Sequence, residues 1–98
     1  MSAVRIRIET LGLPAMAAVI GRRAEIELRG RTVADLVTEI IGRFGPAARR
    51  FVLDADGGLE RSIQIMVNDE GVLSRDELPR RFLADGDRVR FMLLVCGG

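Results

Sequence analysis

The apolar residues between Val33 and Phe44 follow the spacing of one amphipathic helix, and this pattern constrains the fold most. They recur every three or four positions, on one side of a helix: Val33, Leu36, Val37, Ile40, Ile41 and Phe44. Thr32 and Asp35 form the T-x-x-D pattern of a capping box before the helix, and Gly45-Pro46 ends it. Because this helix can cover one face of a sheet, the rest of the core must come from strands.

Other segments alternate apolar and polar side chains, as strands with one face in the core do. We expect strands over residues 4–9, 24–29, 63–67 and 88–95. Val72-Leu73 is a candidate for an additional short strand. Leu13–Ile20 predicts a loop that carries a helical turn, because Pro14 suits the start of a helix and Gly21 its end. Ala47–Leu53 is compatible with one more helical turn.

The order of these elements is strand, strand, helix, strand, short strand, strand. It predicts an α+β domain of the β-grasp kind, with a mixed sheet of four to five strands and one main amphipathic helix. We expect residues 1–98 to form one such domain that ends in a tail at about residues 95–98. A chain of this length can bury a modest single core.

The composition excludes several kinds of functional site. All 15 basic residues are arginine, and the chain has no histidine and one cysteine. The composition therefore excludes catalysis through histidine, metal sites with imidazole ligands and Schiff bases formed on lysine. The net charge of +1 and the lack of Tyr and Trp argue against nucleic acid as a partner. The longest uncharged run, Thr10–Gly21, is too short to cross a membrane, and a lone cysteine suits the cytoplasm.

The last predicted strand has two faces with different expected roles. One face is predicted to join the core: Val89, Phe91, Leu93 and Val95. Met92 and Leu94 then lie on the opposite face, where exposed apolar side chains suit docking to a partner. Arg88 and Arg90 would form the polar rim of that surface. The alternative is that neighbouring loops cover Met92 and Leu94.

Cys96 and three pairs of acidic residues are further candidates for chemistry. Cys96 is interpreted as a small apolar residue that continues the strand, with a thiol near Gly98 that reacts or binds a partner as the alternative. The acidic pairs lie beside turn residues and have no histidine or lysine near them, so turn capping is favoured over metal binding. These pairs are Asp54 with Asp56, Asp76 with Glu77, and Asp85 with Asp87.

With these elements in place, the chain resembles the ubiquitin-like sulfur-carrier proteins of the MoaD/ThiS family over nearly its whole length. The resemblance rests on four motifs and on the element order: Arg31-Thr32-Val33-Ala34-Asp35-Leu36, Val67-Asn68-Asp69-Glu70, Leu83-Ala84-Asp85-Gly86-Asp87-Arg88-Val89 and the terminal Gly97-Gly98. The diglycine is the most specific of them. The Val-Asn-Asp-Glu turn looks closest to the carrier of a bacterial cysteine-biosynthesis route, and the molybdopterin synthase small subunit also begins this turn with Val-Asn.

The resemblance implies a co-substrate rather than an enzyme. In this family a ubiquitin-activating-type enzyme uses ATP and magnesium to adenylate the terminal carboxylate, and a sulfur donor then converts it to a thiocarboxylate. Gly98 would supply that carboxylate, and Gly97 would give the tail clearance in a narrow active site. The implied partners are the adenylyltransferase, a sulfurtransferase and an acceptor enzyme such as a sulfhydrylase or the molybdopterin synthase large subunit. No cofactor, nucleic acid or membrane is expected to bind this chain itself.

Three alternatives keep the same fold. The chain could be the noncatalytic small subunit of molybdopterin synthase, a protein modifier joined to lysines of its targets, or an adaptor that never reacts. Deleting Gly98 separates these readings, because an adaptor should keep its activity whereas a carrier or modifier should lose it.

Overall fold

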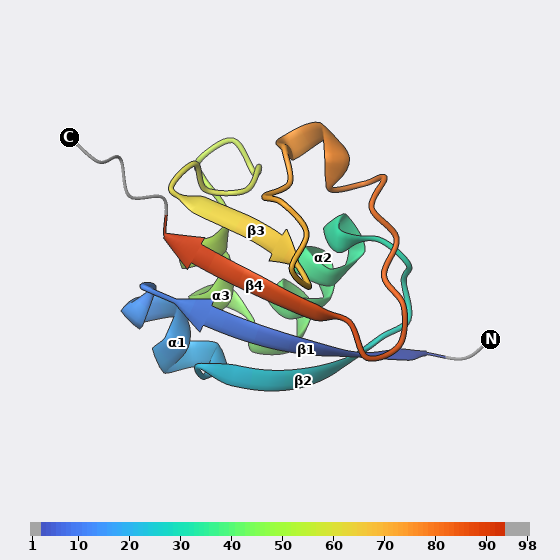
Figure 1. Ribbon diagram of the computed structural model, residues 1–98. Helices are drawn as coiled ribbons and strands as arrows, with labels where there is room; N and C mark the ends of the chain where they lie inside the picture. The colour runs from blue at the N-terminus through green and yellow to red at the C-terminus, as the bar shows by residue number, and fades with distance from the viewer. Residues whose placement is uncertain (1–2, 94–98) are drawn as a thin grey trace.

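Four strands form one mixed sheet in the order β2-β1-β4-β3. The structure is a computed structural model, and it describes residues 3–93 (Figure 1). The strands are β1 (Val4–Leu11), β2 (Arg23–Leu28), β3 (Ile63–Val67) and β4 (Arg88–Leu93). β1 pairs antiparallel with β2 and parallel with β4, and β3 pairs antiparallel with β4. This topology confirms the predicted β-grasp fold.

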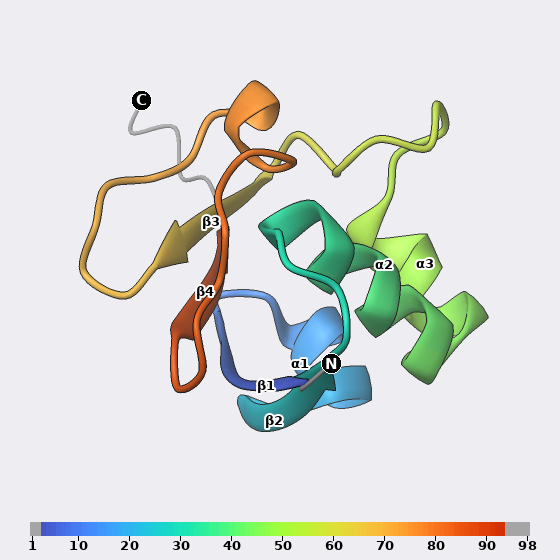
Figure 2. The same ribbon diagram turned by 90° about the vertical axis from the view of Figure 1, so that its right-hand side faces the viewer.

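Helix α2 (Val33–Phe44) begins and ends at the predicted residues and lies against one face of the sheet (Figure 2). The capping box is formed, because Asp35 N donates to Thr32 Oγ1 at 3.2 Å and Thr32 N donates to Asp35 Oδ2 at 3.0 Å. Arg31 N donates to the same oxygen at 2.8 Å. These bonds, from the backbone of Arg31 first and then Thr32, hold the pKa of Asp35 below its ordinary value.

Gly30 makes the approach to this cap possible. A Cβ atom at Gly30 would lie 2.5 Å from the Cβ atom of Asp35, closer than side chains tolerate. The first backbone N–H groups of α2 are also occupied, since Val33 N donates to Arg81 O and Ala34 N to Leu78 O, each at 3.0 Å. The N-terminus of the helix is therefore closed by the chain itself.

Two shorter helices complete the layer on the same face, α1 (Pro14–Ile20) and α3 (Pro46–Val52). Sequence analysis predicted only single helical turns in these places, and each helix instead has seven residues. Both begin with a proline, and both bury small or medium apolar side chains in the core. The buried residues are Met16 and Ile20 in α1 and Ala48 and Val52 in α3.

The predicted short strand at Val72-Leu73 is wrong. Val72 forms one isolated bridge with Met66, and Leu73 N donates to Ile65 O at 2.9 Å. The chain then moves away from β3 into a short 3-10 helix, η1 (Arg75–Glu77). Among residues 3–93 the sheet therefore has four strands, the lower of the two predicted numbers.

The first strand is longer than predicted. The alternation that begins at Val4 runs two residues past Glu9, so that Thr10 turns inward and Leu11 outward. The buried Thr10 hydroxyl donates to Gly21 O at 3.0 Å, which satisfies this polar group in the core. Within the described part of the chain, no helix has the length and apolar character needed to cross a membrane.

Candidate functional site at the carboxyl end of β4

The inner face of β4 agrees with its prediction at two of three described positions. Val89 and Phe91 are fully buried in the core. Leu93 was predicted to join them, and this is wrong, because its side chain is 44% exposed. Residues of α1 and α3 lie beside Leu93 but leave a hollow next to it, so Leu93 borders open space. Val95, the fourth predicted core residue, lies outside the described residues.

The open space beside Leu93 is a groove between α1, α3 and the start of β3, which we call the tail-end groove. Its volume is about 420 Å³. The residues that line it are mostly apolar or small: Gly12, Leu13, Pro14, Ala15, Met16, Arg50, Phe51, Glu60, Ser62, Ile63 and Leu93. Phe51 is 37% exposed and contributes from α3. The groove thus joins three segments of the sequence at the point where the described part of β4 ends.

The outer face of β4 carries Met92 as predicted, on the side of the sheet away from the helices. Its register partners are Leu11 on β1 and Gln64 on β3. Leu11 is 48% exposed, and Met92 is partly buried. Leu11 and Met92 therefore form an apolar pair on the outer face, and a role for Met92 in partner binding stays a prediction. Sequence analysis missed Leu11 because it ended the strand at Glu9.

The two arginines predicted to border Met92 are held by acidic residues of this chain. Arg90 Nε lies 3.1 Å from Glu9 Oε1, across the parallel β1–β4 pair. Arg88 Nη2 lies 2.9 Å from Asp69 Oδ1, and Arg90 Nη1 lies 3.9 Å from the same oxygen. These pairs orient both guanidinium groups along the outer face. A role for Arg88 and Arg90 in partner binding stays a prediction.

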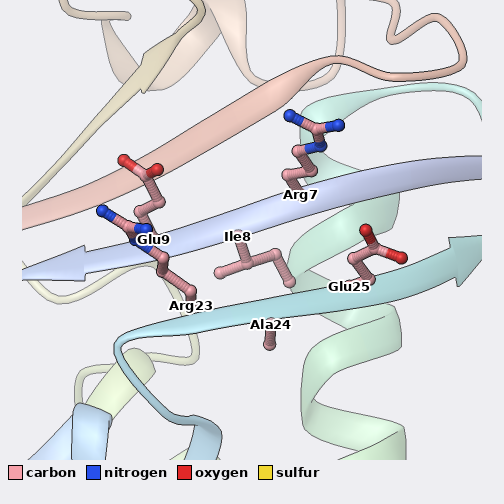
Figure 3. A pocket seen from close by; sticks show the side chains of 6 residues that line it. All are labelled: Arg7, Ile8, Glu9, Arg23, Ala24 and Glu25. Atoms are coloured by element: carbon pink, nitrogen blue, oxygen red, sulfur yellow. The ribbon is translucent and has the colours of Figure 1, made fainter.

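A second groove lies on the outer face between β1 and β2, with a volume of about 320 Å³ (Figure 3). Its rim alternates in charge, because Arg7 is the register partner of Glu25 and Glu9 that of Arg23. Opposite charges across neighbouring strands stabilise a sheet. The four charges balance, so this groove has no net attraction for a charged ligand. We assign it a structural role.

At the other end of β4, the family motif around Asn68 ties two turns together. Asn68 adopts a positive φ of 53°, its Nδ2 donates to Asp87 Oδ1 at 3.1 Å, and its Oδ1 accepts from Arg88 N at 3.0 Å. Asn68 N also donates to Arg88 O at 2.7 Å. The Val-Asn-Asp-Glu turn therefore serves to fix the start of β4. We call these contacts the Asn68 clamp.

Glu70, the last residue of that motif, anchors the loop before β4. Its carboxylate accepts two bonds from Arg81, at 3.1 Å from Nε and 2.7 Å from Nη2. This two-bond geometry is the most specific that an arginine and a carboxylate can form. Because Arg81 O accepts from the first turn of α2, the pair connects the turn after β3 to the helix.

The acidic pairs act largely as the turn caps that sequence analysis predicted. Asp54 Oδ1 accepts from the backbone of Asp56 and Gly58, and Asp87 Oδ2 accepts from Ala84 N at 2.8 Å. Glu77 accepts from the backbone N–H and hydroxyl of Ser74, which lowers its pKa. Asp85 instead accepts from Arg5 N and so holds β1. Residues 3–93 contain no cluster of three or more acidic or cysteine side chains that could hold a metal.

The remaining predicted site residues follow Leu93 in the sequence and lie outside the described residues. They are Leu94, Cys96, Gly97 and Gly98. What the described residues establish is the place from which this segment starts: between the Leu11–Met92 pair on the outer face and the tail-end groove on the helical face.

The comparisons with known proteins agree with this architecture. The model of the ThiS family matches residues 15–98. Small archaeal modifier protein 1 of Haloferax volcanii is similar with a TM-score of 0.74 and 23% identity, over 94% of this chain and 99% of that one. A putative molybdopterin converting factor subunit 1 of Pyrococcus furiosus gives 0.65 and 26%, over 94% and 99%. No curated protein matches the sequence significantly.

A third structure adds a relative seen in a complex. A chain of the BexX/CysO complex of Amycolatopsis orientalis is similar with a TM-score of 0.59 and 24% identity, over 95% of this chain and 99% of that one. The solved structures share the β-grasp fold, and the family match includes Gly97-Gly98. Because that match covers most of the sequence, the chain belongs to the ThiS family of small ubiquitin-like proteins.

Proposed function

We propose that this chain is a sulfur carrier whose reactive group is the carboxylate of Gly98. The observation that carries the proposal is the ThiS family match, which extends through the diglycine at residues 97–98. The similarity to a putative molybdopterin converting factor subunit and to a BexX/CysO complex supports a role as a co-substrate of partner enzymes.

The proposed chemistry has two steps and needs no catalytic side chain from this chain. A Gly98 carboxylate oxygen attacks the α-phosphate of ATP, pyrophosphate leaves, and an acyl-adenylate forms. Hydrosulfide supplied by the sulfur donor then attacks the carbonyl carbon, AMP leaves, and a thiocarboxylate with a new C–S bond remains. The adenylating partner would bind the ATP and magnesium. A chain without histidine or lysine is suited to a reaction in which its own backbone end is the substrate.

Intact-protein mass spectrometry tests this function. The protein is incubated with ATP, magnesium, a ubiquitin-activating-type adenylyltransferase and a sulfur donor. We expect a gain of about 16 Da, the difference between sulfur and oxygen, located at Gly98 by fragmentation. Deleting Gly98 should abolish the gain, and omitting ATP is the matched control. Absence of the gain with an enzyme that adenylates the wild-type chain would contradict sulfur carriage.

A second candidate function, protein modification, is favoured by the similarity to small archaeal modifier protein 1. In this case the amine of a target lysine attacks the Gly98 adenylate, AMP leaves, and an isopeptide bond forms. The same incubation with a lysine-bearing acceptor protein distinguishes the two functions. A modifier yields an adduct with the mass of both proteins less one water, whereas a carrier yields the thiocarboxylate with the acceptor unchanged.

A further inference from the structure

Three large apolar side chains are exposed around the end of β4: Leu11, Phe51 and Leu93. In the described part of the chain, the other large exposed apolar side chains are Val72 and Phe82, both in the segment between β3 and β4. Phe51 and Leu93 line the tail-end groove, and Leu11 lies on the opposite face. The apolar surface of this end therefore includes a hollow as well as the outer face.

The proposed reaction at Gly98 limits where an enzyme that performs it can sit. Residues 94–98 follow Leu93 in the sequence, and a segment of that length spans at most about 18 Å when fully extended. A standard interface of about 800 Å² on each partner has a radius of about 16 Å. An enzyme that encloses the Gly98 carbonyl therefore lies within reach of the end of the domain that carries the tail-end groove.

We propose that the tail-end groove is the docking site for an apolar side chain of the adenylating enzyme. The inference rests on the proposed function, which supplies the enzyme, and adds the surface that it recognises. Leu13, Phe51, Ile63 and Leu93 offer apolar walls, and the volume of about 420 Å³ lies within the range of pockets that enclose ligand groups. A large apolar side chain that fills such a hollow is a typical anchor of an interface.

The charged residues of the groove indicate what surrounds that anchor. Arg50 and Glu60 contribute one positive and one negative side chain to the lining. An enzyme surface that fits the groove would therefore present an apolar side chain within a polar ring of mixed charge, as interface rims do. This surface is on the helical face and is separate from the Leu11–Met92 pair.

The test measures adenylation as ATP–pyrophosphate exchange at increasing concentrations of the carrier chain. Phe51→Ser and Leu93→Ser should each raise the KM for the chain about tenfold, with kcat nearly unchanged, because they remove the walls that receive the anchor. Ala15→Phe should have the same effect by filling the groove, since Ala15 is an exposed residue of its lining. This third variant adds apolar surface, so a general loss of apolar area cannot explain its effect.

The matched controls are Val72→Ser and Phe82→Ser. Val72 is 44% exposed, like Leu93, and Phe82 is 57% exposed, more than Phe51. Both controls should keep the wild-type KM. Circular dichroism and thermal unfolding establish that each variant is folded before its KM is compared. Because Leu93 directly precedes residues 94–98, Leu93→Ser by itself does not separate an effect on the groove from an effect on that segment. Phe51 is in α3, so Phe51→Ser tests the groove independently.

The outcomes separate this inference from the proposed function. A wild-type chain that gains no sulfur contradicts the function itself. A wild-type chain that is adenylated while the groove variants and the controls share one KM overturns only the docking site. Light scattering tests the alternative that a second copy of the chain occupies the groove. If the wild-type chain were a dimer, and Phe51→Ser and Leu93→Ser made it a monomer, the groove would belong to a dimer interface and the proposal would be overturned.

Discussion

The two ends of β4 are held in different ways. At its start, the Asn68 clamp and the Arg88–Asp69 pair join the strand to the turn after β3 through directed polar contacts. At its end, Leu93 borders a mostly apolar groove that residues 3–93 leave unfilled. Within residues 3–93, the first end is tied to its neighbours by polar contacts, whereas the second leaves apolar side chains exposed. Motifs that carry the family resemblance can therefore lie at the opposite end of a strand from the segment that contains the proposed reactive group.

This comparison assigns different roles to residues that sequence analysis treated alike. The Val-Asn-Asp-Glu turn and the segment before β4 both carried the family resemblance, and the structure shows that they bind each other. Their residues hold the register of β4, which in turn determines where Leu93 and the segment after it emerge. The diglycine is the remaining motif, and the proposed chemistry is assigned to it.

Replacing Asn68 should give the largest effect on stability. Asn68→Ala loses two side-chain hydrogen bonds and places alanine at a positive φ, so we expect a loss of about 2–3 kcal/mol in the free energy of unfolding. Asn68→Gly should lose less, because glycine adopts this φ without strain. Urea denaturation measures both.

The KM of Asn68→Ala in adenylation also tests the comparison between the two ends of β4. At a temperature where Asn68→Ala is folded, its KM in adenylation should equal that of the wild-type chain. If Asn68→Ala raised the KM as much as Phe51→Ser while remaining folded, the division of β4 into a structural end and a docking end would be wrong.

Asp35 should make a smaller contribution, and one that depends on pH. Because hydrogen bonds from Arg31 and Thr32 lower its pKa in the folded state, the unfolded chain binds a proton more readily. The stabilisation is therefore present above the ordinary pKa of 3.8 and is lost as the pH falls through the lowered folded value. Asp35→Asn should cost about 1 kcal/mol at neutral pH and progressively less in acid.

Denaturation curves at pH 7 and in acid check this expectation. Glu39→Gln is the matched control, since Glu39 belongs to the same helix and its carboxylate accepts no hydrogen bond within residues 3–93. An Asp35→Asn deficit that persists unchanged in acid would show that the lost charge is not what stabilises the cap.

Cys96 should give the smallest effect. We expect Cys96→Ser to be adenylated and thiocarboxylated at nearly the wild-type rate, because the proposed chemistry uses the Gly98 carboxylate and an external sulfur donor. Intact-protein mass spectrometry over time measures this rate. Loss of the thiocarboxylate in Cys96→Ser would instead show that the thiol takes part, and Cys96→Ala would then report whether its size or its sulfur matters.

The elements with strong local signals were predictable. Helix α2 has a regular stripe and a cap on each side, and the inward residues of β3 alternate without interruption. The lengths of α1 and α3 were underestimated because each helix is short. These helices are stabilised by the burial of residues such as Met16 and Val52. Local sequence contains no direct record of that burial.

The candidate site was predictable only in part, for a related reason. Alternation placed Met92, Arg88 and Arg90 on one face of β4 correctly, since side-chain direction in a strand has a period of two. Alternation also placed Leu93 in the core, and this failed because direction does not establish that another element covers the side chain. Phe51 could not be foreseen, because its exposure depends on how α3 packs.

The sequence by itself determined the order of the main elements, the capping box of α2, the absence of histidine and lysine and the diglycine at residues 97–98. These are properties of neighbouring residues and of composition. Only the tertiary structure decided that Asn68 joins Asp87 and Arg88, and that Leu93 and Phe51 share a groove. Such contacts join residues far apart in the chain, so they exist only once the sheet and its helical layer have packed.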